Sequence, residues 1–371
     1  MRHERGTNDF RGRSAKKPSL SELRAAIDRI DRDLVAQINT RAKLALEIGK
    51  LKQAEGEPTF VPGREDEILS RVVELNKGPI AADSLRAVFR EVVSGTRQLE
   101  KHLRVAFLGP LYTYSHLATL HRFGHSIELV PVASIAAVFE EVNRKQAEYG
   151  LVPIENSTDG RIADTLDMFT RLRVRICSEV QLRIHHALLG RCPRNEVTEV
   201  YSKSQPLSQC RNWLAKHLPA ARPIEVTSTS TAAQVALDKP GTAAIGSVQA
   251  AAHYGLDILA ENIEDNPDNI TRFAVIGSEP AARTGHDKTA AMFGIEHRPG
   301  SLAEAINIFK RNRLNLTWIE SFPIARGEYL FFVELDGHET DLKVRRAFAA
   351  LGKKTLRLEI LGSCPRTEPV G

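Results

Sequence analysis

Residues 20–56 read LSELRAAIDRIDRDLVAQINTRAKLALEIGKLKQAEG, and their apolar residues recur at steps of three and four. This periodicity is typical of one continuous amphipathic helix. Ser19 or Ser21 can cap its start, and Gly56 followed by Pro58 ends it. The expected helix has about 35 residues, whereas a typical globular helix has roughly 8–20. A small domain cannot bury so long a helix alone.

Two shorter helical patterns follow at 63–77 and 81–101, separated by Gly78-Pro79. Three helices, one of them very long, indicate a helical domain that pairs with a second copy of itself. We therefore expect residues 19–102 to form an all-α domain and the protein to be at least a homodimer.

Length and composition exclude several classes of protein. The chain has 371 residues, of which 42% are hydrophobic and 26% are charged. This suits two or three soluble globular domains of about 150 residues each. No run of about 18 apolar residues occurs, so no membrane span is expected. The four cysteines form no C-x-x-C pair, which argues against a disulfide scaffold or a cysteine-rich zinc site and favours a reducing, cytoplasmic location.

Most of the net charge of +5 belongs to residues 1–18, where six basic side chains face two acidic ones. The rest of the chain is close to neutral, so nucleic-acid binding is not expected. The segment has no apolar stretch and is therefore no secretory signal. We expect a disordered, solvated tail, with organellar targeting as the open alternative.

From Arg104 the pattern changes to short β-type runs that alternate with helical ones, which indicates an α/β domain over residues 103–280. The expected strands are Val105–Leu108, Glu148–Val152, Val174–Ile184, Ile224–Val226, Ala243–Ile245 and Phe273–Ile276.

A third pattern begins near Thr289 in the order strand, helix, strand, strand, helix, strand. Its expected elements are Ala290–Glu296, Leu302–Arg311, Leu316–Phe322, Tyr329–Leu335, Leu342–Leu351 and Thr355–Leu361. This βαββαβ order predicts a ferredoxin-like module over residues 288–365, joined by a linker at Gly277–Asp287.

Three basic residues of the long helix are candidate ligand contacts. Arg41 and Lys52 are eleven residues apart, so they share one face and lie roughly 16 Å from each other. Arg24 lies about 25 Å from Arg41 and points to another side, so it can serve only a partner's site in an antiparallel dimer. Such a set fits a small dianion, and a solvated basic face is the alternative.

The motifs LRAAID at 23–28, NTR at 39–41, GKLK at 49–52 and GRE at 63–65 occur in order, and with them residues 20–101 resemble the all-helical chorismate mutases. In that family an intertwined dimer forms two pockets, each completed by an arginine of the other chain. The resemblance implies that Arg41 and Arg64 of one chain, together with Arg24 of the partner chain, hold the substrate carboxylates. It also implies that Lys52 donates to the ether oxygen and that Glu65 holds the ring hydroxyl.

Three positions depart from the mutase pattern. Val61 stands where many relatives have an acid, and Thr96 replaces a frequent Ser. Glu100 aligns with a second donor to the ether oxygen that is often Gln. An ionised carboxylate only accepts hydrogen bonds, so Glu100 can help only when it is protonated. The rearrangement of chorismate to prephenate is pericyclic, so confinement and charge stabilisation suffice and no nucleophile or metal is needed.

Three polar segments lie beside expected strands in the middle of the chain: GPLYTYSH at 109–116, VPIENSTDG at 152–160 and NITRF at 269–273. Open α/β sheets bind ligands at such corners. Ser115 either caps the helix that follows or binds an anion there.

Together with YSKSQ at 201–205, STAA at 230–233 and AAIG at 243–246, these motifs make residues 104–277 resemble the prephenate dehydratases. The chain as a whole resembles the bifunctional chorismate mutase–prephenate dehydratases. The resemblance implies two α/β lobes, the second over roughly 182–255, with the substrate between them.

The same resemblance implies that Thr271 is the proton donor when prephenate loses its ring hydroxyl and CO2 to give phenylpyruvate. It implies a structural or a substrate-binding role for Arg272. Tyr112 and Lys203 depart from the family pattern at the loop edges. No cofactor or metal is implied. The other implied pocket residues are Thr113, Ser115, Glu155, Asn156, Ser157, Gln205, Ser230, Thr231 and Phe273.

Rival functions remain. A fused prephenate dehydrogenase needs a nicotinamide site, yet no G-x-G-x-x-G occurs. A two-lobed ligand sensor without activity, or a dehydratase with a weak mutase domain, stays an alternative. His185-His186 are expected to be packing residues rather than metal ligands.

The last segment carries RPGSLA at 298–303 and IESFP at 319–323, and with them residues 289–364 resemble an ACT regulatory domain. The resemblance implies a phenylalanine site formed by paired modules. Phe322 departs from the usual Glu-Ser-Arg-Pro motif. A purely structural dimerisation module is the alternative. The implied site residues are Pro299, Gly300, Ser301, Leu302, Glu320, Ser321, Phe322 and Pro323.

Overall fold

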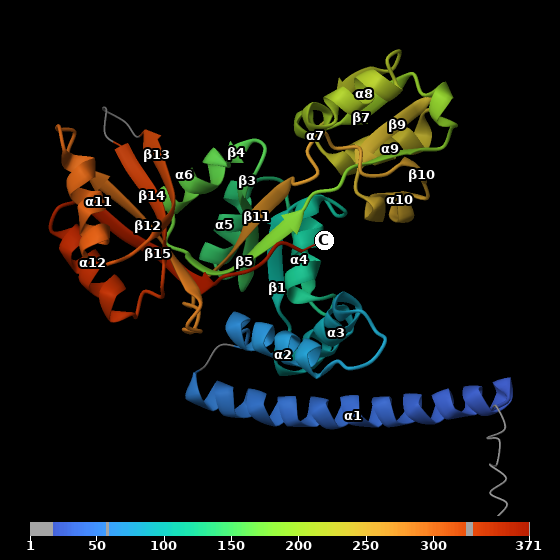
Figure 1. The fold of residues 1–371 in the computed structure, drawn as a ribbon, viewed down its shortest axis with the longest axis horizontal. Helices are drawn as coiled ribbons and strands as arrows, with labels where there is room; N and C mark the ends of the chain where they lie inside the picture. The colour runs from blue at the N-terminus through green and yellow to red at the C-terminus, as the bar shows by residue number, and fades with distance from the viewer. Residues whose placement is uncertain (1–17, 57–58, 324–328, 371) are drawn as a thin grey trace, which may run out of the picture.

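The computed structural model describes residues 18–56, 59–323 and 329–370, and the expected tail at 1–18 lies almost entirely outside them. Figure 1 shows a long helix along one side, two α/β lobes in the middle and at one end, and a βαββαβ module at the other end. In the described residues no helix combines the length and the apolar character that crossing a membrane requires.

The helical segment confirms the three predicted helices: α1 (Leu20–Glu55), α2 (Pro62–Leu75) and α3 (Ala82–Glu100). Ser19 and Glu22 form a reciprocal capping box at the start of α1, and Gly56 ends it in the left-handed conformation. No residue of α1 is buried. The helix lies along the outside of the molecule (Figure 1), and its apolar stripe therefore faces solvent in the single chain.

The first lobe is a sheet in the order β2-β1-β3-β11-β5, with a short β4 paired to β3. Strand β11 runs antiparallel to both β3 and β5, so the residues around position 271 lie inside the sheet. Its strands are β1 (Arg104–Leu108), β2 (Glu128–Val132), β3 (Tyr149–Asn156), β4 (Gly160–Arg161), β5 (Arg175–Arg183) and β11 (Ile270–Gly277). Its helices are α4 (Tyr114–Phe123), α5 (Ile135–Asn143) and α6 (Ala163–Arg171).

The second lobe is a separate sheet in the order β10-β6-β9-β7-β8, inserted between β5 and β11. Several of its strands have only four residues, which explains why hydrophobic runs predicted some of them and missed β6, β7 and β10. Its strands are β6 (Ala187–Gly190), β7 (Glu199–Ser202), β8 (Arg222–Glu225), β9 (Thr242–Gly246) and β10 (Asp257–Ala260). Its helices are α7 (Ser204–Gln209), α8 (Arg211–His217), α9 (Thr229–Asp238) and α10 (Val248–Tyr254).

The C-terminal module has the predicted βαββαβ order, with an antiparallel sheet β13-β14-β12-β15. Strand β15 is longer than predicted because its second half pairs with the start of β12. There a Cβ on Gly362 would lie 2.2 Å from the Ile176 carbonyl oxygen, so only glycine allows this approach to the first lobe. The elements are β12 (Asp287–Ile295), α11 (Ser301–Arg311), β13 (Leu316–Pro323), β14 (Tyr329–Asp336), α12 (Leu342–Gly352) and β15 (Arg357–Pro365).

The first lobe and the C-terminal module share one hydrophobic core. Met292, Phe332 and Leu361 of the module belong to the same buried cluster as Val152 and Ile276 of the lobe. The sequence analysis predicted a linker at Gly277–Asp287 and no shared core between the lobe and the module.

The linker itself is packed as well. Ala281 is buried in the second core cluster of the lobe, and Asp287 is already the buried start of β12. Beyond β15 the chain returns to the lobe, where Val370 forms backbone hydrogen bonds with Gln181 and Arg183 of β5. The module is therefore part of the same structural unit as the first lobe.

Candidate active sites

The predicted mutase residues of α1 and α3 meet along the line where the two helices pack. Arg41 Nη1 donates to Thr96 Oγ1 at 2.7 Å. One turn further along α3, Glu100 Oε2 lies 3.9 Å from Lys52 Nζ. Lys52 Nζ also donates to the Thr59 carbonyl at 3.4 Å. A side chain at Gly49 would meet Glu100, so the glycine leaves room for that carboxyl. These four side chains form one half-site of the helical segment.

Two predicted mutase residues lie apart from this half-site. Arg24 is exposed on α1, about 25 Å along the helix from Arg41. Arg64 is exposed as well and pairs with Glu67 at 2.9 Å on its own helix. The isolated chain does not bring either residue to Lys52.

Glu65 is bound by Arg97, a residue that the sequence analysis did not single out. Arg97 is buried, pairs with Glu65 and donates to the Phe123 carbonyl oxygen. Its guanidinium also lies over the Phe60 ring at 5.4 Å. Arg97 therefore orients Glu65 and attaches the helices to the first lobe at the same time.

Glu100 is the chemically unusual member of the half-site. Its Oε2 is buried and has no hydrogen-bond partner among the described residues. Burial raises the pKa of Glu100, while Lys52 and Arg97 oppose part of that effect. A raised pKa favours the protonated carboxyl, which is the form able to donate a hydrogen bond.

In the α/β region, Thr271 of β11 faces Asn156 at the end of β3. Asn156 Nδ2 donates to Thr271 Oγ1 at 2.8 Å and to Asn269 Oδ1 at 2.9 Å. The amide orientation is determined, because Asn156 Oδ1 accepts from the backbone N–H groups of Thr158 and Asp159. Thr271 Oγ1 is therefore the acceptor in its bond to Asn156, and its own hydrogen remains available to a ligand.

A chain of hydrogen bonds extends from Asn156 into the two segments that connect the lobes. Asn269 Nδ2 donates to Gln209 Oε1 at 3.0 Å, and the same oxygen lies 2.9 Å from His186 Nε2. Burial lowers the pKa of His186, so the ring is neutral. Because Gln209 Oε1 can only accept, His186 donates to it from Nε2. The Tyr114 hydroxyl lies 2.8 Å from His186 Nδ1 and also donates to the His185 carbonyl oxygen at 2.8 Å.

Sequence reasoning missed most of this network. Gln209 carried no signal, because a lone amide on a helix has no distinctive spacing, whereas Tyr114 stands inside the segment at 109–116. Asn269 stands in the same motif as Thr271 and could have been found there. His186 was predicted to be a packing residue, and it is buried as a hydrogen-bonding member of the network.

The second lobe contributes amides and hydroxyls to the same junction. Gln205 and Gln209 both donate to the carboxylate of Asp159. On the first-lobe side of the junction, Ser157 Oγ accepts from the Ile270 N–H at 2.9 Å. Ser230 Oγ donates to the Leu111 carbonyl at 2.7 Å, which ties the lobes together beside the loop that precedes α4.

The helix that follows this loop is capped by Thr113 rather than by Ser115. Thr113 Oγ1 accepts from the His116 N–H, and Ser115 is buried in the first turn. On the opposite side, Thr231 belongs to the cap of α9, where its N–H donates to Ser228 Oγ at 2.9 Å. These hydroxyls shape the loops at the junction.

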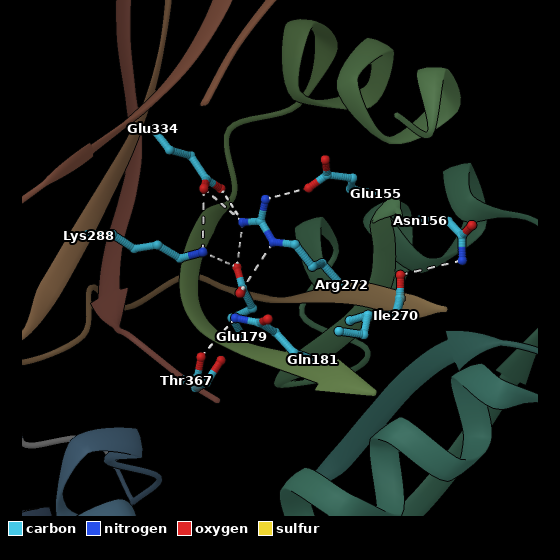
Figure 2. Close-up of polar contacts among 9 residues, drawn as sticks. All are labelled: Glu155, Asn156, Glu179, Gln181, Ile270, Arg272, Lys288, Glu334 and Thr367. Carbon is cyan, nitrogen blue, oxygen red and sulfur yellow. Dashed lines mark hydrogen bonds and ion pairs between the residues drawn. The ribbon is translucent and has the colours of Figure 1, made fainter. Parts of the chain in front are cut away.

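Three predicted pocket residues do not face the Thr271 hydroxyl. Phe273 is fully buried in the core. Arg272 projects from the face of β11 opposite to Thr271, as alternation along a strand requires. It pairs there with Glu155, and Figure 2 shows the contacts. This placement favours the structural alternative for Arg272.

The predicted phenylalanine segments lie at one end of the module sheet, where Tyr329 pairs with both Ile295 and Pro323. Ser301 Oγ is buried without a hydrogen-bond partner among the described residues. Glu320 pairs with Arg161 of β4. Pro299, Gly300, Leu302 and Ser321 are exposed, and Phe322 is half-buried against the shared core.

A cavity of about 870 Å³ lies elsewhere on the module. Arg283, Arg311 and Arg346 are among its lining residues, and no predicted site residue is. The described residues contain no group of three or more His, Cys, Asp or Glu side chains that could hold a metal ion.

These features define a class of fused protein, in which a helical segment with Arg41 and Lys52 packed against a second helix precedes a two-lobed α/β unit with a polar junction. The prephenate dehydratase family matches residues 105–281, and the type II chorismate mutase family matches residues 23–101. A bifunctional chorismate mutase/prephenate dehydratase of Aquifex aeolicus is 43% identical over 94% of this chain and 98% of its own length. The chain belongs to the family of bifunctional chorismate mutase/prephenate dehydratases.

Solved structures resemble the part of the chain that follows the helices. A prephenate dehydratase from Arthrobacter aurescens in complex with L-Phe has a TM-score of 0.67 and 33% identity, and it covers 71% of this chain and 90% of its own. A protein described as a novel type of quorum-quenching acylase has a TM-score of 0.65 and 25% identity over 71% of this chain and 98% of its own. The fold alone therefore does not determine the reaction, which depends on the residues of the site.

The pH dependence of the mutase tests Glu100. Activity should fall as pH rises through the pKa of Glu100, because only the protonated carboxyl donates to the ether oxygen. Burial raises this pKa, so the fall should begin above the value of about 4.3 for an ordinary Glu. Glu100→Gln should flatten the profile because its amide donates at every pH. Glu74→Gln, exposed on α2, is the matched control. The same profile in wild type and Glu100→Gln would mean that Glu100 does not face the substrate.

Proposed function

We propose that the junction of the two α/β lobes dehydrates and decarboxylates prephenate, with Thr271 as the proton donor to the departing ring hydroxyl. One observation carries the proposal. Asn156 Nδ2 donates to Thr271 Oγ1 at 2.8 Å, so the threonine hydrogen points away from Asn156. A free hydroxyl hydrogen beside a fixed N–H donor is what this reaction requires.

The reaction balances when Thr271 supplies one proton and regains it from solvent at the end of the turnover. The C–CO2 bond of prephenate breaks, its electron pair enters the ring, and the ring C–O bond breaks. The hydroxyl leaves as water with the proton of Thr271, whose oxygen becomes negative. A bare threonine is a poor acid, but the Asn156 N–H strengthens as a donor when charge develops on that oxygen. Ser157, Gln205, Ser230 and Thr231 are the proposed contacts of the substrate carboxylates.

The helical segment is proposed to rearrange chorismate to prephenate in a homodimer or a higher oligomer of such dimers. The apolar stripe of α1 supports this, because Ile27, Leu34 and Ile48 are each about half exposed in the single chain. The length of α1 and the position of Arg24 favour a second copy of the chain as the partner that covers this apolar stripe. The partner's Arg24 would then join Arg41 and Lys52 around the dianion. Neither proposed reaction uses a cofactor, and the cytoplasmic location stays a prediction from the sequence.

The C-terminal module is proposed to be an ACT domain that binds phenylalanine. The Ser301 hydroxyl, which is buried and has no hydrogen-bond partner among the residues that the structure describes, supports a polar ligand at this place. The Arg161 side chain donates to Glu320 and to the Ser321 carbonyl. In the antiparallel pairing of β4 with β3, Arg161 lies opposite Glu155. A ligand at Glu320–Pro323 would therefore act only a few residues from Asn156 along the same hairpin.

Replacing Thr271 separates the two activities. Thr271→Val keeps the shape of the side chain but removes the hydroxyl, so phenylpyruvate formation should fall by at least about 100-fold while prephenate formation from chorismate is unchanged. Thr271→Ser keeps the hydroxyl and should retain measurable activity. Separate assays of prephenate and phenylpyruvate check both. A dehydratase rate close to wild type in Thr271→Val would remove Thr271 from the mechanism.

A mixing experiment tests the shared mutase site. Arg24→Ala and Arg41→Ala should each abolish mutase activity. If subunits exchange, half of the dimers in an equal mixture combine both chains, and one of their two sites is intact. The mixture should therefore regain about a quarter of wild-type activity, as the two-fold symmetry of a dimer requires. Each variant mixed with itself is the control. No recovery despite proven exchange would place Arg24 outside the partner's site.

Phenylalanine should inhibit the dehydratase although Phe322 replaces an arginine. The ammonium and carboxylate of the ligand can bind backbone groups at the start of α11 and at the end of β13, so backbone shape matters more than that side chain. Inhibition of roughly 5-fold or more is expected at saturation, the usual range of allosteric coupling. Initial rates and thermal unfolding with L-phenylalanine check this, with D-phenylalanine as the control. If saturating L-phenylalanine changes neither, the module has only a structural role.

A further inference from the structure

The most completely paired charge in the described structure is Arg272, next to Thr271 in the chain. It donates to Glu155 at 2.6 Å, to Glu179 at 2.8 Å and to both carboxylate oxygens of Glu334 at 2.7 Å. Lys288 lies between Glu179 and Glu334 and pairs with both. We call these five residues the Arg272 cluster (Figure 2).

The Arg272 cluster joins two structural units. Glu155 and Glu179 belong to strands β3 and β5 of the first lobe, which flank β11. Glu334 and Lys288 belong to strands β14 and β12 of the C-terminal module. The side chains of Glu179 and Glu334 are only 2% and 5% exposed. Bonds to buried carboxylates are strong and directional, so they fix the guanidinium in one place.

The sheet is irregular beside Arg272 on its β3 side, whereas the pairing of β11 with β5 is regular there. The register between β11 and β3 shifts between Arg272 and Phe273. Such a bulge interrupts the ladder and re-aims the neighbouring side chains. Strand alternation puts Thr271 on the opposite face, toward Asn156. A movement of Arg272 would therefore turn the Thr271 hydroxyl away from its partner.

We propose that Glu334 is a positioning residue for the dehydratase: by holding Arg272 from the C-terminal module, it fixes the Thr271 hydroxyl against Asn156. The inference rests on the proposed role of Thr271. It makes turnover at the lobe junction depend on a carboxylate that lies in another structural unit and does not touch the substrate. Loss of Glu334 should therefore lower kcat while KM changes little.

Glu334→Gln is a mild way to test this. The cluster holds two cations and three carboxylates, so removing one negative charge leaves the remaining charges balanced. The amide also has nearly the same shape as the carboxylate. We expect kcat of the dehydratase to fall by roughly 10- to 100-fold, because small misplacements of a reacting group cost that much. KM should stay within about two-fold, and the mutase rate should not change.

The chain offers a matched control across the same contact. Glu339 pairs with Arg175, and Arg175 lies on β5 opposite Gly277, at the far end of β11 from Arg272. Glu339→Gln therefore weakens the contact between lobe and module without touching the Arg272 cluster. It should leave kcat of the dehydratase within about two-fold of wild type.

A second variant covers the case in which Glu334→Gln unfolds, as judged by its mutase rate and thermal unfolding. Glu334→Gln combined with Lys288→Gln keeps the net charge of the cluster and should show the same loss in kcat. A wild-type kcat in the folded variant would overturn the proposal. So would equal losses in Glu334→Gln and Glu339→Gln, because these would reflect general docking. If the proposed role of Thr271 as proton donor is wrong, the Thr271→Val enzyme is active, and this result is distinct from the outcomes above.

Discussion

A largely buried guanidinium needs charged partners, and this requirement at Arg272, whose side chain is 16% exposed, connects the first lobe to the C-terminal module. Carboxylates from β3, β5 and β14 surround it, and the Trp318 ring lies 5.4 Å from its charge. Separating the module from the lobe would strip Arg272 and Lys288 of a buried partner, which typically costs several kcal/mol, about 3–5. The buried apolar side chains around Phe332, which come from both the lobe and the module, stabilise the same contact. The strand that carries Thr271 therefore runs beside the contact between the first lobe and the C-terminal module, which combines buried ion pairs with a shared apolar core.

The two reactions use different physical means. In the proposed mechanisms, the helical half-site would supply charges along one groove of a dimer and rely on confinement, whereas the lobe junction would supply the Thr271 hydroxyl, which accepts a hydrogen bond from the Asn156 amide. The helices are nevertheless attached to the lobe. Arg122 of α4 donates to Asp66 of α2 at 2.7 Å, and Phe60 is buried in the core of the lobe. The mutase half-site is therefore carried by the dehydratase rather than loosely linked to it.

The sequence predicted those parts that depend on local periodicity. The long helix with its caps, the βαββαβ order and the polar segments around Asn156 and Thr271 are as expected. The polarity of the Asn156 amide could not be predicted, because it depends on two backbone N–H groups of the following turn. The partners of Arg272 were also out of reach, since Glu179 and Glu334 lie 93 and 62 residues away along the chain. Neither has a motif around it, so the sequence analysis predicted a linker and no shared core between the lobe and the module.

Native-state hydrogen exchange tests the central claim that the first lobe and the C-terminal module are one cooperative unit. The amides to compare are those of Phe273–Val275 in β11 and of Ala291–Phe293 in β12, which lie inside their respective sheets. If the Arg272 cluster and the shared core hold the units together, both sets should exchange with the same free energy of opening and the same response to denaturant. Exchange of the β12 amides through a separate opening of lower free energy, while β11 stays protected, would contradict the account.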